Sequence, residues 1–588
     1  MIADKACAYT IHPEVLEQKA QWVERSGAAE LLDQYFEESR GRGGRVSEYR
    51  FSMLGYLTVK AALMAIPRAA SDAEAYRVIR ELTVDQLERL GMNAEVRTAS
   101  DKAFYNWIAR RLRVVDPGFD LPARRVTNAE HRRHVGSRTP EVSAAVHLAA
   151  DRLHAVVNLL VAASVDETHP AGARGDIVID ETVVDLAGQS DGLGSRDNKF
   201  RAAAYMGAYY VRDREDNSIN TAGQPVKTVK KAAFGIGITA VTRIGDVEDL
   251  YGVAPVITGI AIHKPTSASI EGATRAIQAH QQHGFDNRKG TRGRLPYLTV
   301  DMGYNQKRGF NDACLDLGYS PVVRYPRSWR AVWASAGDEH TFRGVPAGPV
   351  QIAGDFYCPA AARIATGTTR LVRKTVDILD DDDGFERHDR RLEALLPMLM
   401  GTNSRPYRAR PQGRPRKDSD SARPTARIDL VCPAVQGRVR CPLKPASMVA
   451  GPETPTVTPS WNAEDFRCCA KSQVTVEYSR DQWRMATWGM TPGSWEHATY
   501  FEAARALTEQ RFSVMKSVHV AGISDLHWSG RREPGIAILV ALWVASTNRA
   551  IQDSHSRRRK RRTSSIKRRW AHIEEDLGRR PVTIPPRT

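Results

Sequence analysis

The order of apolar runs between residues 176 and 326 limits the fold of this chain more than any other feature. Short runs of β-forming residues, separated by Gly, Asn and Asp, occupy residues 177–187, 202–211, 232–243 and 253–264. A helix, a strand, a second helix and a second strand are then predicted at 268–284, 295–301, 305–318 and 319–325. Several strands followed by alternating helices and strands indicate an α/β core.

This order of elements is that of a ribonuclease-H-like core, and the rest of the chain is organised around it. Residues 1–140 are predicted to form a helical N-terminal domain, with DNA binding as one possible role. The core is expected to span 141–326 and to be completed by closing helices at 491–553. Residues 327–490 are predicted as an inserted β-rich domain with a basic loop, and 554–588 as a disordered basic tail.

Two short helices in the N-terminal region leave two interpretations open. Val84 to Leu90 is predicted as a helix capped by Thr83, and Ser100 is predicted to cap a second, basic helix. A short helix followed by a basic one is typical of a helix-turn-helix DNA-binding motif. A plain helical bundle with a solvated basic face has the same pattern.

The chain is strongly basic, with a formal net charge of +17 that is concentrated in residues 405–417 and 556–570. Such charge favours polyanionic partners. The seven cysteines are too few for a disulfide scaffold in so long a chain. The N-terminus has no apolar signal core, and the longest apolar run, 535–545, is shorter than the roughly 20 residues that span a bilayer. We therefore expect a cytoplasmic protein without a membrane segment, in which 535–545 is a buried helix.

Three acidic residues indicate a catalytic site. Asp180 and Asp301 follow strongly apolar strand-like runs, where an acid needs a reason to be present. Glu509 lies on a late helix, and Arg505 and Lys516 fall on the same helical face. Magnesium prefers oxygen ligands, and two-metal phosphoryl transfer needs acids that converge from different elements. The pattern predicts an Asp, Asp, Glu triad acting on nucleic acid.

The same residues resemble the DDE transposases of bacterial insertion sequences, in the group with a ribonuclease-H-like core and a β-rich insertion before the last acid. The late helix of that group has Tyr, Arg, Glu and Lys at fixed spacing, and this chain has Arg505, Glu509 and Lys516 in register. Glu502 occupies the place of the Tyr, and Tyr500 lies two residues earlier, so either Tyr500 substitutes for it or its role is lost. Asp301 is followed by Met, Gly and Tyr, which matches the second motif of the group except for a missing basic residue.

The resemblance implies specific roles for these residues. Asp180, Asp301 and Glu509 would hold two magnesium or manganese ions, and Arg505, Lys516 and Tyr500 would contact DNA near the cleavage site. It implies terminal inverted repeats and target DNA as partners, with a homodimer or larger assembly as the active complex. The alternatives are a catalytically inactive DNA-binding protein derived from a transposase, and a nuclease with the same core. The neighbouring acids Glu181, Asp185, Glu496 and Glu502 compete for the assignment.

Two further patterns allow more than one interpretation. Residues 412–417, which include Arg414, Arg416 and Lys417, resemble an AT-hook for narrow A·T minor grooves, but a simple basic linker explains them equally well. Four cysteines of the insertion are candidates for a zinc site: Cys432, Cys441, Cys468 and Cys469. Against zinc, the chain has no Cys-x-x-Cys pair there, and adjacent cysteines rarely both ligate one ion.

Overall fold

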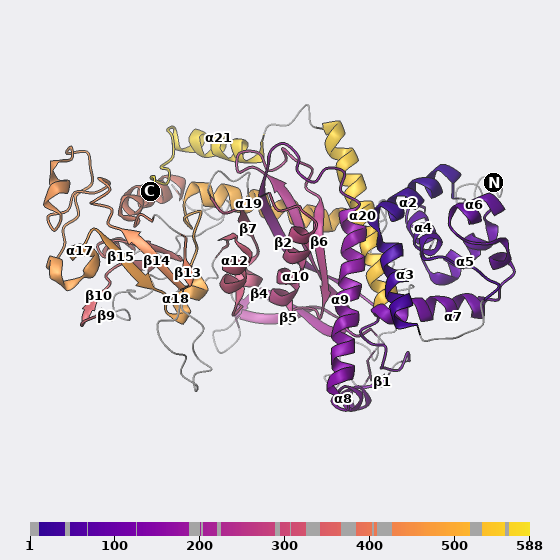
Figure 1. The fold of residues 1–588 in the computed structure, drawn as a ribbon. Coiled ribbons are helices and arrows are strands. Elements are labelled where there is room, and N and C mark those ends of the chain that lie inside the picture. Colours follow the sequence, from indigo (N-terminus) through magenta and orange to yellow (C-terminus); the bar gives the residue numbers. More distant parts are fainter. Residues whose placement is uncertain are drawn as a thin grey trace.

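The protein is a mixed α/β structure, seen in a computed structural model as three regions in a row: N-terminal helices, a central sheet and an inserted region (Figure 1). The structure describes residues 11–40, 47–66, 69–124, 126–186, 200–201, 204–219, 225–287, 294–305, 307–324, 341–365, 384–402, 405–408, 426–517, 532–558 and 564–587.

The N-terminal region is helical, as predicted. Its helices are α2 (Pro13–Ser26), α3 (Ala28–Ser39), α4 (Met53–Leu63), α5 (Asp72–Glu81), α6 (Val84–Arg89), α7 (Asp101–Leu112) and the short 3₁₀ turns η1 (Ala94–Arg97) and η2 (Arg113–Val115). Thr83 caps α6 in a capping box, and the Ser100 hydroxyl accepts the Ala103 N–H at the start of α7. Both caps are confirmed, and the choice between a helix-turn-helix and a plain bundle stays open.

Two long helices join this region to the sheet. Helix α9 (Pro140–Ala162) follows α8 (Asn128–Gly136), and α20 (Glu533–Arg558) packs against α9 and α4. By length and composition alone both would be long enough to cross a membrane. Within its most apolar stretch, however, α20 is 78% buried inside the protein, and α9 is 44% buried. The buried helix predicted at 535–545 is thus confirmed, since these residues lie in the first half of α20.

The central sheet is mixed, with antiparallel and parallel strands. Its strands are β2 (Ala173–Asp185), β4 (Ala208–Ile219), β5 (Pro225–Gly245), β6 (Ile257–His263), β7 (Tyr297–Thr299) and β8 (Ser320–Val322). The second half of β5 pairs antiparallel with both β6 and β2, and its first half pairs with β4. Strand β2 pairs parallel with β7, and β7 pairs parallel with β8, which gives the order β6-β5-β2-β7-β8.

Helices cover both faces of this sheet. Helices α10 (Ser269–Gln282) and α12 (Phe310–Leu317) pack with Ile177 and Ile179 of β2 on one face. Helix α19 (Trp495–Met515) packs against Val178 on the other face, where α20 also lies. Because strand side chains alternate between faces, Asp180 points to the α19 side and Glu181 to the α10 side.

The inserted region is not as rich in strands as predicted. It holds short strands, β9 (Thr341–Phe342), β10 (Val345–Pro346), β11 (Val350–Ile352), β12 (Asp355–Tyr357), β13 (Tyr407–Arg408), β14 (Ala426–Val431) and β15 (Gln473–Glu477). Helices lie between them: α14 (Ala361–Ala365), α16 (Gly384–Leu395), α17 (Arg467–Ala470) and α18 (Arg480–Met485). The described part is therefore mixed, because α16 buries Phe385, Leu392 and Leu395 in a core of its own that the strands alone do not form.

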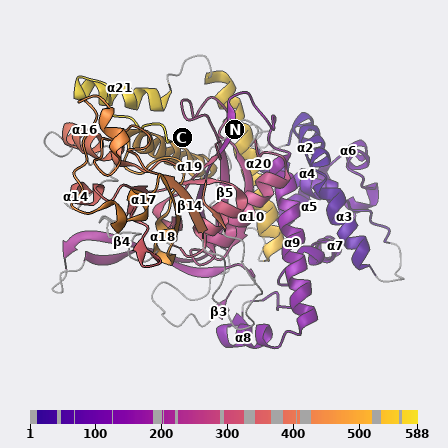
Figure 2. The same cartoon turned by 60° about the vertical axis from the view of Figure 1, so that its left-hand side comes forward.

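The prediction of a disordered C-terminal tail is wrong for the described residues of 554–588. Helix α20 continues to Arg558, and α21 (Ser565–Leu577) packs on α16 and α19, above the sheet in Figure 1. After α21 the Arg587 guanidinium pairs with both carboxylate oxygens of Asp355, at 2.8 and 2.9 Å. Apolar residues such as Ile566 and Ile573 anchor α21 among its many charges. Figure 2 shows the chain end on the same side as α16 and α19.

Candidate active site

Asp180 lies in the middle of the central strand, on the face that α19 covers. It pairs with Ala240 of β5 in the sheet register, and 15% of its side chain is exposed. Its Oδ1 accepts the Glu181 N–H at 2.8 Å, and its Oδ2 accepts a hydrogen bond from Arg505 Nη1 at 2.9 Å. A carboxylate in the interior of a sheet is therefore held by two donors at a fixed position.

Asp301 lies just past β7, the parallel neighbour of β2. Its Oδ1 accepts the Gly303 N–H at 2.7 Å, and a Cβ on residue 303 would lie only 2.9 Å from that oxygen. A glycine at 303 therefore lets the following turn approach the carboxylate. Asp301 Oδ2 accepts no hydrogen bond from the described residues, so this oxygen is available to another ligand.

Helix α19 brings the third predicted acid and its neighbouring cation. Ser494 caps the helix, and Leu507 and Ala504 bury its inner face against the sheet. Arg505, 17% exposed, bonds Asp180 through Nη1 and Glu509 Oε1 through Nη2, the latter at 3.2 Å. Glu509 is 67% exposed. Arg505 thus connects an acid of the sheet to an acid of the helix.

The three acids form one electrostatic group. Burial raises the pKa of Asp180 and the charge of Asp301 adds to the rise, while Arg505 opposes it. Burial works against the charge on Arg505, but Asp180, Asp301 and Glu509 outweigh it and raise the pKa of that guanidinium. A buried acid with a raised pKa beside a second acid is typical of functional sites.

The remaining predicted DNA contacts have different outcomes. Lys516 is exposed at the C-terminal cap of α19. The prediction for Tyr500 is wrong: its ring is 1% exposed and packs against Tyr297, with 5.5 Å between the ring centroids. Tyr500 faces the sheet because it shares the apolar face of α19 with Ala504 and Leu507, so it is a core residue. The predicted basic contacts of the inserted loop lie outside the described residues: Arg414, Arg416 and Lys417.

The competing acids have other partners. Glu181 accepts hydrogen bonds from Ser269 Oγ and the Thr266 N–H on the opposite face of the sheet, and Asp185 accepts one from Tyr210. Glu502 bonds Arg324 and Arg569, which ties α19 to β8 and α21. Glu496 accepts the Ile584 N–H, which holds the C-terminal segment. These contacts are structural and leave Asp180, Asp301 and Glu509 as the candidate set.

Sequence reasoning missed a buried polar group on the α10 face of the sheet. Tyr304 is 3% exposed, and its hydroxyl oxygen lies 3.5 Å from Thr239 Oγ1, which in turn lies 2.7 Å from His263 Nε2. Burial raises the pKa of Tyr304 well above its usual value, and Asp180, Glu181 and Asp301 raise it further. The aromatic residue after Asp-x-Gly was visible in the sequence as a signal, but its buried partners were not.

The carboxylates of the three acids are suitable ligands for a cation such as magnesium, although Arg505 lies between two of them. Among the described residues, no three His, Cys, Asp or Glu side chains are placed so that they hold a metal ion together. The chemistry of the acids nevertheless suits magnesium or manganese, because the candidate ligands are all carboxylate oxygens and no described residue donates to Asp301 Oδ2.

Comparison of the chain with protein-family models, with curated proteins and with solved structures gave no match.

Proposed function

We propose that this chain is a DDE-type DNA transposase, which cuts DNA at the ends of an insertion sequence and joins the cut strands to a target. One observation carries the proposal: Asp180 on β2 and Asp301 past its parallel neighbour β7 both lie in the field of Arg505 on α19. Glu509, about one helical turn after Arg505, brings a third carboxylate to the same place. Three acids from three elements are what two-metal phosphoryl transfer requires.

The fold of the core is part of the same proposal. Three antiparallel strands, β6, β5 and β2, are followed by two strands parallel to β2, with a helix before each. This supports a ribonuclease-H-like core whose closing helix, α19, comes after the inserted region.

The chain's own residues would prepare the site in separate ways. Asp180, Asp301 and Glu509 would hold two magnesium or manganese ions, which when bound supply activation of the attacking hydroxyl and stabilisation of the leaving oxygen. Arg505 opposes the rise in the pKa of Asp180 that burial causes, and it fixes the direction of the carboxylate. Glu509 is two-thirds exposed, so its side chain can rotate towards Asp301 without displacing buried atoms. Lys516, exposed at the end of α19, would contact DNA phosphates.

Partners and location follow from this function. The DNA partners would be terminal inverted repeats and target DNA, bound by a homodimer or larger assembly in the cytoplasm. The formal charge of +17 supports a polyanionic partner.

DNA cleavage tests the proposal. Purified full-length protein is incubated with Mg²⁺ and DNA carrying the coding region with its own flanks, and the breaks are mapped. We expect breaks at one fixed position on each flank, and Asp180→Asn and Asp301→Asn to reduce them at least about 100-fold with DNA binding retained in a gel shift. Asp185→Asn is the matched control, because it lies on the same strand but bonds Tyr210 instead. Equal loss in the control, or undiminished cleavage in the two variants, refutes the site.

Strand transfer separates a transposase from a nuclease. With a second DNA as target, the proposal predicts covalently joined products, and Lys516→Ala should reduce joining about tenfold, which corresponds to about 1.4 kcal/mol of transition-state contact. Cleavage at the flanks without any joined product would instead assign the chain to the nucleases.

A further inference from the structure

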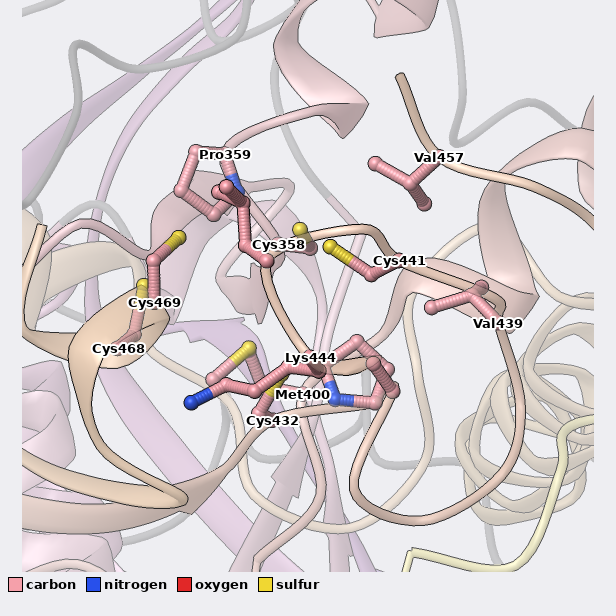
Figure 3. Close-up of a pocket in the computed structure, with 13 residues that line it drawn as sticks. Cys358, Pro359, Met400, Cys432, Val439, Cys441, Lys444, Val457, Cys468 and Cys469 are labelled. Carbon is pink, nitrogen blue, oxygen red and sulfur yellow. The ribbon is translucent and has the colours of Figure 1, made fainter. Parts of the chain in front are cut away.

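Five cysteines of the inserted region line one small cavity, which none of the acids of the candidate active site lines. Cys358 follows β12, Cys432 follows β14, Cys441 lies in the next loop, and Cys468 and Cys469 are on α17. Figure 3 shows them arranged around the cavity from these separate segments. All five are buried, and none is in a disulfide. The cavity measures about 10 Å³, which is room for a single water-sized sphere.

Three of these cysteines begin the same kind of turn. Each is followed by proline, and its carbonyl accepts the N–H three residues later, at 2.9 Å for Cys358, 3.0 Å for Cys432 and 2.9 Å for Cys441. Proline at the second position favours such a turn. The repeated Cys-Pro turn places single cysteines in separate segments and so leaves no Cys-x-x-Cys pair in the sequence.

The turns bring backbone amides near sulfur. The amide of Ala360 acts to lower the pKa of Cys358, and those of Leu443 and Lys444 act to lower the pKa of Cys441, against the larger effect of burial. A neutral thiol is a weak acceptor, whereas a thiolate is a strong one. Both sulfurs are buried, and a bound cation would stabilise them as thiolates.

The charge around the cavity also favours an anionic cluster. Arg438 does not line the cavity but lies close enough for its charge to interact with Cys432, and its Nε and Nη1 atoms have no hydrogen-bond partner among the described residues. The positive charge of Lys444 favours the thiolate form of Cys469, and Trp461 Nε1 donates a hydrogen bond to the Cys469 sulfur at 3.4 Å. Four thiolates around a divalent cation carry a net charge of −2, which these cations would balance.

We propose that Cys358, Cys432, Cys441 and Cys469 bind one structural zinc ion. Each loses its thiol proton to solvent as its sulfur joins the zinc, and no oxidation or reduction takes place. The sulfurs surround the cavity without converging on one point, so binding requires rotation of the thiols about χ1. Cys468 is left out because its sulfur packs under Gly348, where a Cβ would lie 2.5 Å from it. The zinc would tie β12, β14 and α17 together, and this proposal does not depend on the proposed function.

Zinc content of the full-length protein tests the proposal. The protein is purified under reducing conditions, dialysed against metal-free buffer and analysed for zinc by mass spectrometry. We expect about one zinc per chain in the wild type, and loss of at least about nine-tenths of it in Cys358→Ser and Cys441→Ser. Cys468→Ser and Cys314→Ser are the matched controls and should keep their zinc, because Cys468 is not a proposed ligand and Cys314 is a buried cysteine of α12 that does not line the cavity. A wild type without zinc, or zinc retained in Cys358→Ser, overturns the proposal.

A second measurement covers variants that fail to fold. Cobalt is titrated into the wild-type protein after zinc is removed with a chelator, and the absorption spectrum is recorded. Four thiolate ligands predict strong sulfur-to-cobalt charge-transfer absorption and the visible bands of a tetrahedral ion. Absence of these bands overturns the proposal, as does a Cys468–Cys469 disulfide found by mass spectrometry in protein that binds no metal.

Discussion

Replacing Arg505 by alanine removes two ion pairs that differ in burial. Arg505 bonds Asp180, which is 15% exposed, and Glu509, which is 67% exposed. Breaking a buried ion pair costs about 3–5 kcal/mol, and the residual exposure of both partners reduces this to about 2–3 kcal/mol. An exposed pair on a helix contributes only about 0.3–0.5 kcal/mol. Arg505→Ala should therefore destabilise the contact between α19 and β2 several times more than Glu509→Gln.

Hydrogen exchange is the suitable assay, because a chain of this size need not unfold in one step. Peptides from β2 and α19 should lose about 2–3 kcal/mol of protection in Arg505→Ala and at most about 0.5 kcal/mol in Glu509→Gln. The loss should also depend on pH. Burial and Asp301 already raise the pKa of Asp180, and removal of Arg505 raises it further. A carboxyl whose pKa is raised in the folded state contributes fully to stability below its pKa in the unfolded state and loses that contribution as the pH rises. The destabilisation by Arg505→Ala should therefore be larger at about pH 8 than at about pH 5.

Two results would refute this reasoning. Equal losses in the two variants would mean that Arg505 acts through Glu509 and the helix alone. A loss that grows towards acidic pH would mean that Asp180 is not the buried partner.

Three further predictions concern buried charges elsewhere. Burial raises the pKa of Glu533 to about 7, so the ionisation of Glu533 destabilises the fold increasingly as the pH rises towards that value. Glu533→Gln should therefore stabilise the protein by about 1 kcal/mol near pH 5 and by about 3 kcal/mol near pH 8. Thermal melting at both pH values measures the difference. Asp72→Ala should cost about 3 kcal/mol of exchange protection in α4, because it leaves Lys60, 1% exposed, without the carboxylate 3.0 Å away; unchanged protection would contradict this. Arg587→Ala should release the C-terminal segment from Asp355 and increase its cleavage by carboxypeptidase and trypsin at least about tenfold, and resistance equal to the wild type would show that other contacts hold the segment.

The core strands and helices were predictable because their apolar residues repeat with the period of each element. The runs predicted at 177–187, 232–243 and 253–264 correspond to β2, β5 and β6, and the helix predicted at 268–284 is α10. Local capping signals were also sufficient for α6 and α7. The prediction for the C-terminal tail failed because charge was weighed over the few apolar anchors of α21, Ile566 and Ile573.

The contacts of the candidate site were less predictable because they join distant segments. Arg505 and Glu509 were visible as a pair on one helix, but Asp180, 325 residues away from Arg505, is the buried partner. The burial of Tyr500 could have been predicted from the sequence, because Tyr500, Ala504 and Leu507 are spaced so that they share one apolar face of a helix. Cys358 escaped notice because it is far in sequence from the other cysteines, and only the fold brings it to them.

The central claim is that Asp180 and Asp301 bind the metal ions that cut DNA, and replacement of each by cysteine tests it most directly. A thiolate binds Mg²⁺ poorly and Mn²⁺ well. We predict that Asp180→Cys and Asp301→Cys lose cleavage of the flanking DNA with Mg²⁺ and recover at least about a tenth of wild-type activity with Mn²⁺. Cleavage that is equally strong with Mg²⁺, or that Mn²⁺ fails to restore in a variant that still binds DNA, would contradict the claim.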